Sequence, residues 1–238
     1  MRLDKLLANM GYGSRKEVKE LCKKKKVTLN GTYVKDASQH IDPITDHIQV
    51  NGGTVSYKPY VYIMLNKPKG VISATEDIQD KTVVDLLQLD IQQYNPFPVG
   101  RLDKDTEGLL LLTNDGELAH VLTSPKKKIE KTYFAKIEGF VTEEDITKFA
   151  SGVVLDDGYE TKPGKLVVKK EGEISEVELT ITEGKFHQVK RMFKSVGKKV
   201  VYLKRIRMGM LELDNSLRLG DYRELTNNEV NALRQKNN

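Results

Sequence analysis

The first quarter of the chain shows helical spacing of hydrophobic residues, followed by a strand-like pattern. Apolar side chains within residues 3–10 recur at helical spacing until Gly11, which predicts one helix. Ser14 and Glu17 then form a capping box that opens a second helix. Residues 27–34 hold two short apolar runs on either side of an Asn-Gly pair, which is typical of a β-hairpin.

The middle of the chain holds its most apolar run, Leu109–Leu112, directly after Gly108. A run of this kind, bounded by turn residues, predicts a buried strand. An earlier run at 61–65 has the same character and leads into a turn held by Pro68 and Gly70. Buried strands form a rigid base, so polar loops next to them are suitable places for a positioned catalytic group.

Short strands and short helices alternate through the rest of the chain. In residues 131–137 the apolar side chains of Tyr133, Ala135 and Ile137 fall on one face of a strand. Further strands are predicted at 166–168, 174–181 and 200–207, and helices at 83–87, 117–122, 142–150, 186–196 and from a capping box at Thr226 onward. Because the elements lack a regular strand–helix–strand rhythm, they favour an α+β fold over a doubly wound sheet.

Length and composition limit the class of protein. A chain of 238 residues accommodates one large domain, or a mid-sized domain with a small one. A single cysteine, Cys22, excludes an intramolecular disulfide and a thiolate metal cluster, and its spacing from Val18 predicts a core position. No apolar run approaches the roughly 18 residues of a membrane span, and charges interrupt the apolar N-terminal positions. These features predict a cytoplasmic protein.

The positive charge is concentrated near the N-terminus. Residues 1–57 contain ten Lys and Arg against six Asp and Glu, whereas the remaining residues contain 29 against 28. The basic run Lys23–Lys26 contributes strongly to this excess, and Lys58-Pro59 marks a boundary after it. The asymmetry favours an anion-binding N-terminal module on a nearly neutral body, with an ordinary solvated helix face as the alternative.

Asp103 is the first candidate for chemistry, because it stands in a polar loop just before the apolar run. A carboxylate there can act as a nucleophile or as a general acid or base, and Arg101 or Lys104 can keep it ionised. An Asp that caps a turn is the structural alternative. The neighbouring acidic residues Asp105 and Glu107 also allow a metal-dependent nuclease, although no His or further acidic cluster completes a ligand set.

Two other segments hold candidate functional residues that also have ordinary structural interpretations. Tyr133 lies in a predicted strand, where an aromatic residue usually packs in the core. His187 has no evident metal-binding partners and is more typical of a hydrogen-bonding residue, whereas Lys190 and Arg191 fit a solvated helix face. Local spacing alone therefore leaves both interpretations open.

Taken together, the motifs resemble the pseudouridine synthases of the small-subunit (16S) rRNA type. Residues 1–57 resemble the S4 RNA-binding module, and residues 61–238 resemble the family's catalytic domain with its mixed or antiparallel sheet. The motifs that carry the resemblance occur in family order and include Leu65-Asn-Lys-Pro-Lys-Gly70, Gly100-Arg-Leu-Asp103, Lys131-Thr-Tyr133, His187-Gln-Val-Lys190 and Gly220-Asp-Tyr-Arg-Glu-Leu-Thr226.

The resemblance implies roles for particular residues. Asp103 would be the catalytic carboxylate, Tyr133 would stack on the flipped uracil and help to remove its C5 proton, and Lys190 would pair with Asp103. Some relatives carry Arg where this chain has Lys190, which offers a point charge in place of a bidentate pair. Leu203 would pack beside the site. The residues expected to contact substrate or RNA are Arg101, Leu203, Lys67, Lys69, Arg191, Arg15, Lys23, Lys24, Lys25 and Lys26.

The implied reaction is the isomerisation of one uridine to pseudouridine in 16S rRNA, without a cofactor or a metal. The implied partner is rRNA, with 16S rRNA in a partly assembled small subunit as the expected form, and neither a membrane nor an obligate protein partner is expected. The alternatives are a synthase acting on 23S rRNA, a non-catalytic rRNA-binding or assembly protein, and the metal-dependent nuclease.

Overall fold

The structure is a computed structural model that describes residues 1–55 and 57–235. Its contacts divide the chain into two compact units, one formed by Met1–Val61 with Gln88–Asn95 and the other by Tyr62–Leu87 with Pro96 onward. The sequence boundary at 57–61 falls close to this division. The grouping of Gln88–Asn95, which contains the short helix α3 (Leu89–Gln92), with the first unit was not predicted.

The first unit packs two helices with a small antiparallel sheet. The predicted capping box is confirmed, since the Glu17 amide donates to Ser14 Oγ and the Ser14 amide donates to a Glu17 carboxylate oxygen. Cys22 is buried in the core of the unit, as its spacing predicted. The elements are α1 (Leu3–Asn9), α2 (Arg15–Lys23), β1 (Val27–Leu29), β2 (Thr32–Tyr33), β3 (Ile48–Val50) and β4 (Gly53–Thr54), with sheet order β2-β1-β3-β4.

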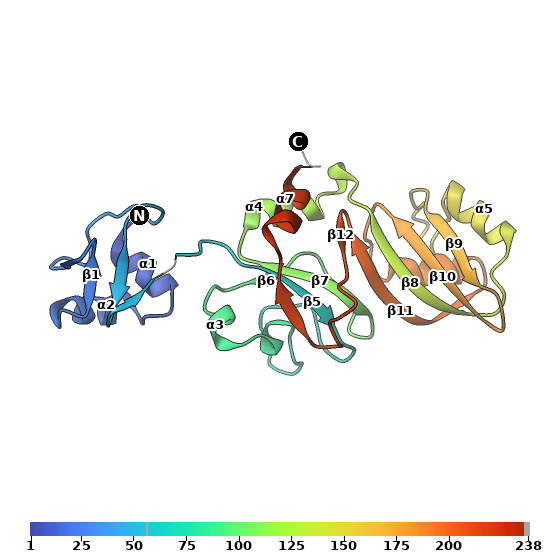
Figure 1. The fold of residues 1–238 in the computed structure, drawn as a ribbon. Helices are drawn as coiled ribbons and strands as arrows, with labels where there is room; N and C mark the ends of the chain where they lie inside the picture. The colour runs from blue at the N-terminus through green and yellow to red at the C-terminus, as the bar shows by residue number, and fades with distance from the viewer. Residues whose placement is uncertain (56, 236–238) are drawn as a thin grey trace. The chain divides into compact units, whose positions relative to one another are not determined.

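The second unit is built on one long mixed sheet, whose strands run from the centre to the right of Figure 1. Its strand order is β13-β5-β7-β11-β8-β10-β9, and β11 and β7 are its parallel neighbours. The expectation of an α+β fold with a mixed or antiparallel sheet is confirmed. The strands are β5 (Tyr62–Lys67), β6 (Phe97–Pro98), β7 (Glu107–Thr113), β8 (Lys131–Glu138), β9 (Lys165–Lys170), β10 (Ile174–Ile181), β11 (Lys199–Met208), β12 (Leu211–Glu212) and β13 (Tyr222–Glu224).

Strand β7 lies between β5 and β11 and is buried on both faces. Leu109 and Leu111 belong to a core cluster with residues of α4 (Gly116–Thr123) and α7 (Asn227–Gln235). Successive side chains of a strand point to opposite faces, so Leu110 faces the other side, where it is equally buried. An unbroken apolar run is what such a strand requires, and the loop before β7 is thereby fixed to the most rigid part of the unit.

Two further helices support the other half of the sheet. Helix α5 (Glu143–Ser151) lies against β9, and its Phe149 ring packs 4.9 Å from the Phe193 ring of α6 (Gln188–Ser195). The short 3-10 helices are η1 (Val84–Leu86) and η2 (Pro125–Lys127). Within the described residues, no helix is long and apolar enough to span a membrane.

The sequence pattern misplaced or missed a few elements. It predicted a helix over 186–196, but α6 starts at Gln188, because His187 has a left-handed backbone with φ 48° that cannot continue a right-handed helix. It also missed β13, whose residues Tyr222–Glu224 pair with β5 in a short, mostly polar segment.

Candidate active site

The loop that carries Asp103 is fastened from inside by Lys67, at the end of β5. The Lys67 ammonium group donates to the backbone carbonyls of Pro68 at 3.0 Å, Asp103 at 3.1 Å and Thr106 at 3.0 Å. Its side chain is fully buried, and burial lowers its pKa to about 8, although nearby carboxylates partly offset that effect. The expectation that Lys67 contacts RNA is therefore wrong, because all three of its N–H donors are engaged inside the protein.

The Asp103 carboxylate faces a basic residue from helix α6. Lys190 Nζ donates to Asp103 Oδ2 at 3.1 Å and to Asp105 Oδ1 at 2.6 Å, and His187 Nε2 lies 3.6 Å from Asp103 Oδ1. Burial lowers the pKa of Lys190, but the bonds to the two carboxylates outweigh burial and raise it overall. The positive charge that faces Asp103 is thus supplied from a segment 87 residues further along the chain.

A buried carboxylate fixes the start of α6 and therefore the position of Lys190. Glu183 accepts hydrogen bonds from Gln188 Nε2 at 2.6 Å, the Tyr159 hydroxyl at 2.8 Å and the Lys162 amide at 3.0 Å. The Lys185 amide in turn donates to Gln188 Oε1 at 2.8 Å. These bonds tie the loop before α6 to the neighbouring segment that contains Tyr159.

Asp103 lines a cavity of about 690 Å³ on the face of the sheet formed by β8 and β11. Tyr133, Leu203 and Arg205 line it, and Tyr133 and Arg205 are directly opposed across the two strands. Phe186 stands at the cavity with its side chain 71 % exposed and stacks on the His187 ring at 3.8 Å. The cavity thus combines a carboxylate, a cation and an aromatic ring, and its size is typical of small-molecule sites.

Gly108, near the start of β7, allows β7 and β11 to approach closely. Its φ is +102°, and an added Cβ would clash with the carbonyl oxygen of Arg205 and lie 2.8 Å from the Arg205 amide nitrogen. Both atoms belong to the backbone of a central strand and cannot move away. A glycine is therefore required at this position if Arg205 is to lie beside the loop that carries Asp103.

The remaining candidates for RNA contact differ in how accessible their charges are. Arg101 is exposed at the cavity, and Lys69 is exposed with its ammonium 5.2 Å from the Tyr202 ring centre. Arg191 is engaged by Asp156 at 2.6 Å and Asp157 at 2.7 Å, so two carboxylates already balance its charge. In the first unit, the side chains of Arg15, Lys23, Lys24, Lys25 and Lys26 are exposed, and Lys23 pairs with Glu20 at 2.7 Å.

Three polar residues of the cavity had no role assigned from the sequence: the buried Arg205 and Glu183 and the half-buried Lys131. The two-residue period of a strand could have indicated two of them. Lys131 precedes Tyr133 by two positions, and Arg205 follows Leu203 by two. Each therefore shares a strand face with a residue already singled out. Glu183 lies in a loop, where no periodicity could have indicated its burial. Across the described part of the chain, no three His, Cys, Asp or Glu side chains gather in a way that could hold a metal ion.

The site pairs a carboxylate with lysine beside an aromatic wall, and the chain also carries a small basic unit, a combination suited to an enzyme that acts on RNA. Comparison with known proteins gives the family. Residues 61–195 match the RNA pseudouridylate synthase family and residues 1–44 match the S4 domain. The chain therefore belongs to the RNA pseudouridylate synthase family and is an enzyme of that class.

Several relatives are similar along their whole length. An uncharacterized RNA pseudouridine synthase of Bacillus subtilis is 53 % identical over 99 % of both chains. A ribosomal large subunit pseudouridine synthase B of the same organism is 44 % identical over 98 % of this chain and 95 % of the relative. A ribosomal small subunit pseudouridine synthase A of Yersinia pestis is 40 % identical over 97 % of both.

A solved structure shares the fold. A crystal structure of a pseudouridylate synthase has a TM-score of 0.69 and 37 % identity, and the match covers 98 % of this chain and 99 % of that one. The family predicted from the motifs is thus confirmed, together with the S4 domain. The relatives include enzymes named for both ribosomal subunits, so the comparison leaves the choice of subunit to experiment.

Proposed function

We propose that this enzyme isomerises a specific uridine of ribosomal RNA to pseudouridine, with Asp103 as its catalytic carboxylate. The observation that carries the proposal is the position of Asp103, which lies at the cavity, 3.1 Å from Lys190, on a loop fixed by Lys67. Full-length relatives named as ribosomal pseudouridine synthases support rRNA as the substrate class. The exposed lysines of the first unit support RNA binding, because phosphate contacts need accessible cations.

The proposed reaction begins when the target uridine leaves the RNA stack and enters the cavity, at a cost of a few kcal/mol. Asp103 either bonds to C1′ and leaves again when C5 attacks that carbon, or takes a proton from the ribose and later returns it. In both routes the bond from C1′ to N1 breaks with its electron pair going to the base. The base rotates, forms a bond from C5 to C1′, and loses the C5 proton to regain its aromatic electron system. Tyr133, in the cavity wall, stacks on the base and helps to remove that proton.

The choice between the two ribosomal RNAs rests on the motifs. The start of the chain and the strings Thr123-Ser-Pro125 and Tyr222-Arg-Glu-Leu-Thr226 resemble the 16S type most. The relative named for the large subunit is slightly more identical than the one named for the small subunit, at 44 % against 40 %. On the strength of the motifs we propose 16S rRNA as the first substrate to test, and the identity values make 23S rRNA the rival.

The test is release of tritium from C5 of labelled uridine in 16S and 23S rRNA, both free and in partly assembled particles. Asp103→Asn is expected to abolish release while RNA affinity stays within about threefold of wild type, because it removes the reactive charge and little volume. Asp105→Asn is the matched control, since Asp105 shares Lys190 but its side chain is 69 % exposed. It is expected to retain most of the activity.

The outcomes separate the possibilities. Release from 16S rRNA alone, lost in Asp103→Asn, establishes both reaction and substrate. Release from 23S rRNA alone keeps the reaction and moves the substrate to the large subunit. Full release by Asp103→Asn would disprove the role of Asp103, and rRNA binding without any release would favour a non-catalytic role in ribosome assembly.

A further inference from the structure

The floor of the cavity holds two cations that the proposed mechanism does not use. Arg205 is 2 % exposed, and its Nε donates to the Leu109 carbonyl at 2.8 Å, whereas its buried Nη2 has no hydrogen-bond partner within the described residues. A buried guanidinium N–H without an acceptor costs free energy, and a ligand oxygen that reached this N–H from the cavity would remove that cost.

Lys131 lies on the same face and lacks a direct carboxylate partner among the described contacts. Its ammonium group donates to the Ile129 carbonyl at 3.1 Å, and its side chain lines the cavity with Tyr133, two residues along β8. Burial and, to a smaller extent, the positive charge of Arg205 lower the pKa of Lys131 to about 8, with Glu183 partly offsetting both. Two cations are therefore brought together, with Glu183 already engaged by three other donors.

We propose that Lys131 and Arg205 form a cationic floor that binds a carbonyl oxygen of the flipped uracil and stabilises the negative charge on the base once its glycosidic bond has broken. This inference rests on the proposed function. When the C1′–N1 bond breaks, the electron pair on N1 delocalises onto O2 and, through the C5–C6 double bond, onto O4. A fixed cation beside either oxygen stabilises that state more than the intact nucleoside, which is the condition for faster chemistry.

Their position favours the base over a phosphate group as the ligand. Arg205 stands directly opposite Tyr133 across β8 and β11, so a base stacked on the Tyr133 ring lies next to the guanidinium. The buried position of Arg205 also suits a desolvated base, whereas the phosphates of an RNA strand stay hydrated and follow exposed cations. The exposed Arg101 and Lys69 are better placed for such contacts.

The test compares Lys131→Met, which keeps the length and removes the charge, with Lys131→Arg, which keeps the charge. Single-turnover tritium release is measured on whichever rRNA the wild-type enzyme modifies. Lys131→Met is expected to slow tritium release about 100-fold, which is the usual effect of removing one donor that stabilises charge in the transition state. RNA affinity and its salt dependence are expected to stay unchanged. Lys131→Arg is expected to stay within about tenfold of wild type, because its guanidinium supplies the charge without accepting a proton.

Lys136→Met is the matched control on the same strand. Lys136 points to the other face of β8 and pairs with Glu176 at 3.3 Å, so its loss is expected to leave release unchanged. Arg205→Lys tests the second cation, with a thermal melt as the check on folding, because the side chain is buried. Its expected effect is slower release at saturating RNA with a retained cooperative melt.

The results can be told apart from failure of the proposed function. Wild-type enzyme that releases no tritium from any rRNA would overturn the proposed function itself. An active wild type with a Lys131→Met variant of equal rate would overturn the cationic floor. A Lys131→Met variant that loses affinity and about 0.7 units of salt slope, with an unchanged rate at saturation, would assign Lys131 to a phosphate. A Lys131→Arg variant as slow as Lys131→Met would show that lysine transfers a proton, and would also overturn the proposal.

Discussion

At the scale of single residues, the site depends on a glycine as much as on its charged groups. Gly108→Ala is expected to destabilise the protein by about 3 kcal/mol, because the new methyl group clashes with the backbone of Arg205 and the φ of +102° disfavours a side chain. Urea unfolding gives the difference in unfolding free energy. Any variant protein that still folds is expected to show slower tritium release, since relief of the clash must shift Arg205.

The matched control for this change is Gly116→Ala, at the start of the helix that follows β7. A Cβ at Gly116 meets no atom within 4 Å, and the residue opens helix α4, where alanine is the better helix former. Its unfolding free energy is expected to equal or exceed that of wild type. Equal stabilities for the two alanine variants would contradict the close approach of β7 and β11.

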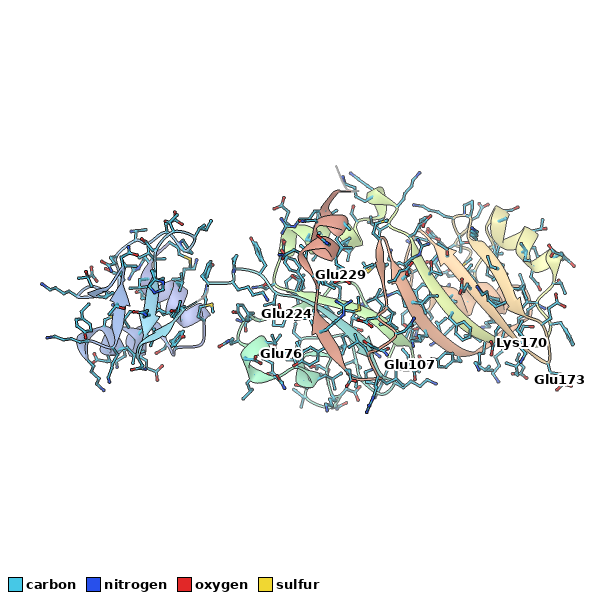
Figure 2. The ribbon with its side chains drawn as sticks, viewed as in Figure 1. Glu76, Glu107, Lys170, Glu173, Glu224 and Glu229 are labelled. Atoms are coloured by element: carbon cyan, nitrogen blue, oxygen red, sulfur yellow. The ribbon has the colours of Figure 1, made fainter. Side chains whose placement is uncertain are left out.

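At the scale of elements, an arginine joins β13, α7 and the loop after β12. Arg223 donates to Asp214 at 2.6 Å and to both carboxylate oxygens of Glu229 at 2.8 and 2.9 Å. Figure 2 labels Glu229 on α7 and Glu224 at the end of β13. Hydrogen bonds from Arg223 lower the pKa of Glu229 to about 2, and bonds from Ser216 and Arg223 lower that of Asp214 to about 2.

Because both carboxyl groups have a lower pKa in the folded state, their contribution to stability is present above about pH 4.5 and is lost as the pH falls toward 2. Arg223→Met is expected to lower the free energy of unfolding at pH 7 and to make its decrease in acid shallower. Urea unfolding from pH 7 to pH 3 measures both quantities. Arg218→Met removes an exposed arginine from the same loop and is expected to match wild type. A pH dependence unchanged by Arg223→Met would refute the linkage.

Most elements were predictable because their physical signals are local. The apolar run of β7, the alternation of β8 and the capping boxes of α2 and α7 each specify one element within about ten residues. Strand β13 was missed because its pairing with β5 is set by residues more than 150 positions away. The start of α6 was misplaced because His187 adopts a left-handed backbone that the Glu183 network holds, and no spacing rule encodes that network.

At the scale of the whole molecule, the site assembles from separate stretches of sequence. Asp103 stands before β7, Tyr133 on β8 and Lys190 on α6, and the sheet order β7-β11-β8 brings them together. Hydrophobic periodicity indicated each stretch, but it did not indicate that the three stretches lie together. That expectation came from the resemblance of the motifs to the family. The same limit explains the error at Lys67, because a lysine in a glycine- and proline-rich turn is expected to be exposed until the loop that folds over it is known.

The charge asymmetry between the two units gives a prediction about RNA binding. Lys24, Lys25 and Lys26 follow α2 with exposed side chains, and lysines of this kind release counterions when they bind the phosphates of duplex RNA. The triple change to Gln is expected to weaken rRNA binding at low salt and to reduce the slope of log affinity against log salt by about 0.9 for each phosphate that is no longer neutralised. Filter binding across a salt series measures both, while the single-turnover rate at saturating RNA is expected to stay unchanged.

The matched control removes three lysines from the catalytic unit. Lys165, Lys169 and Lys170 are exposed on β9, with Lys169 paired to Glu178 at 3.4 Å and Lys170 labelled near Glu173 in Figure 2. Their change to Gln removes the same net charge, so it accounts for any effect of overall charge alone. An equal decrease of slope in both triple variants would mean that RNA senses net charge. A decrease confined to the Lys24–Lys26 variant would mean that the small basic unit itself contacts the phosphates.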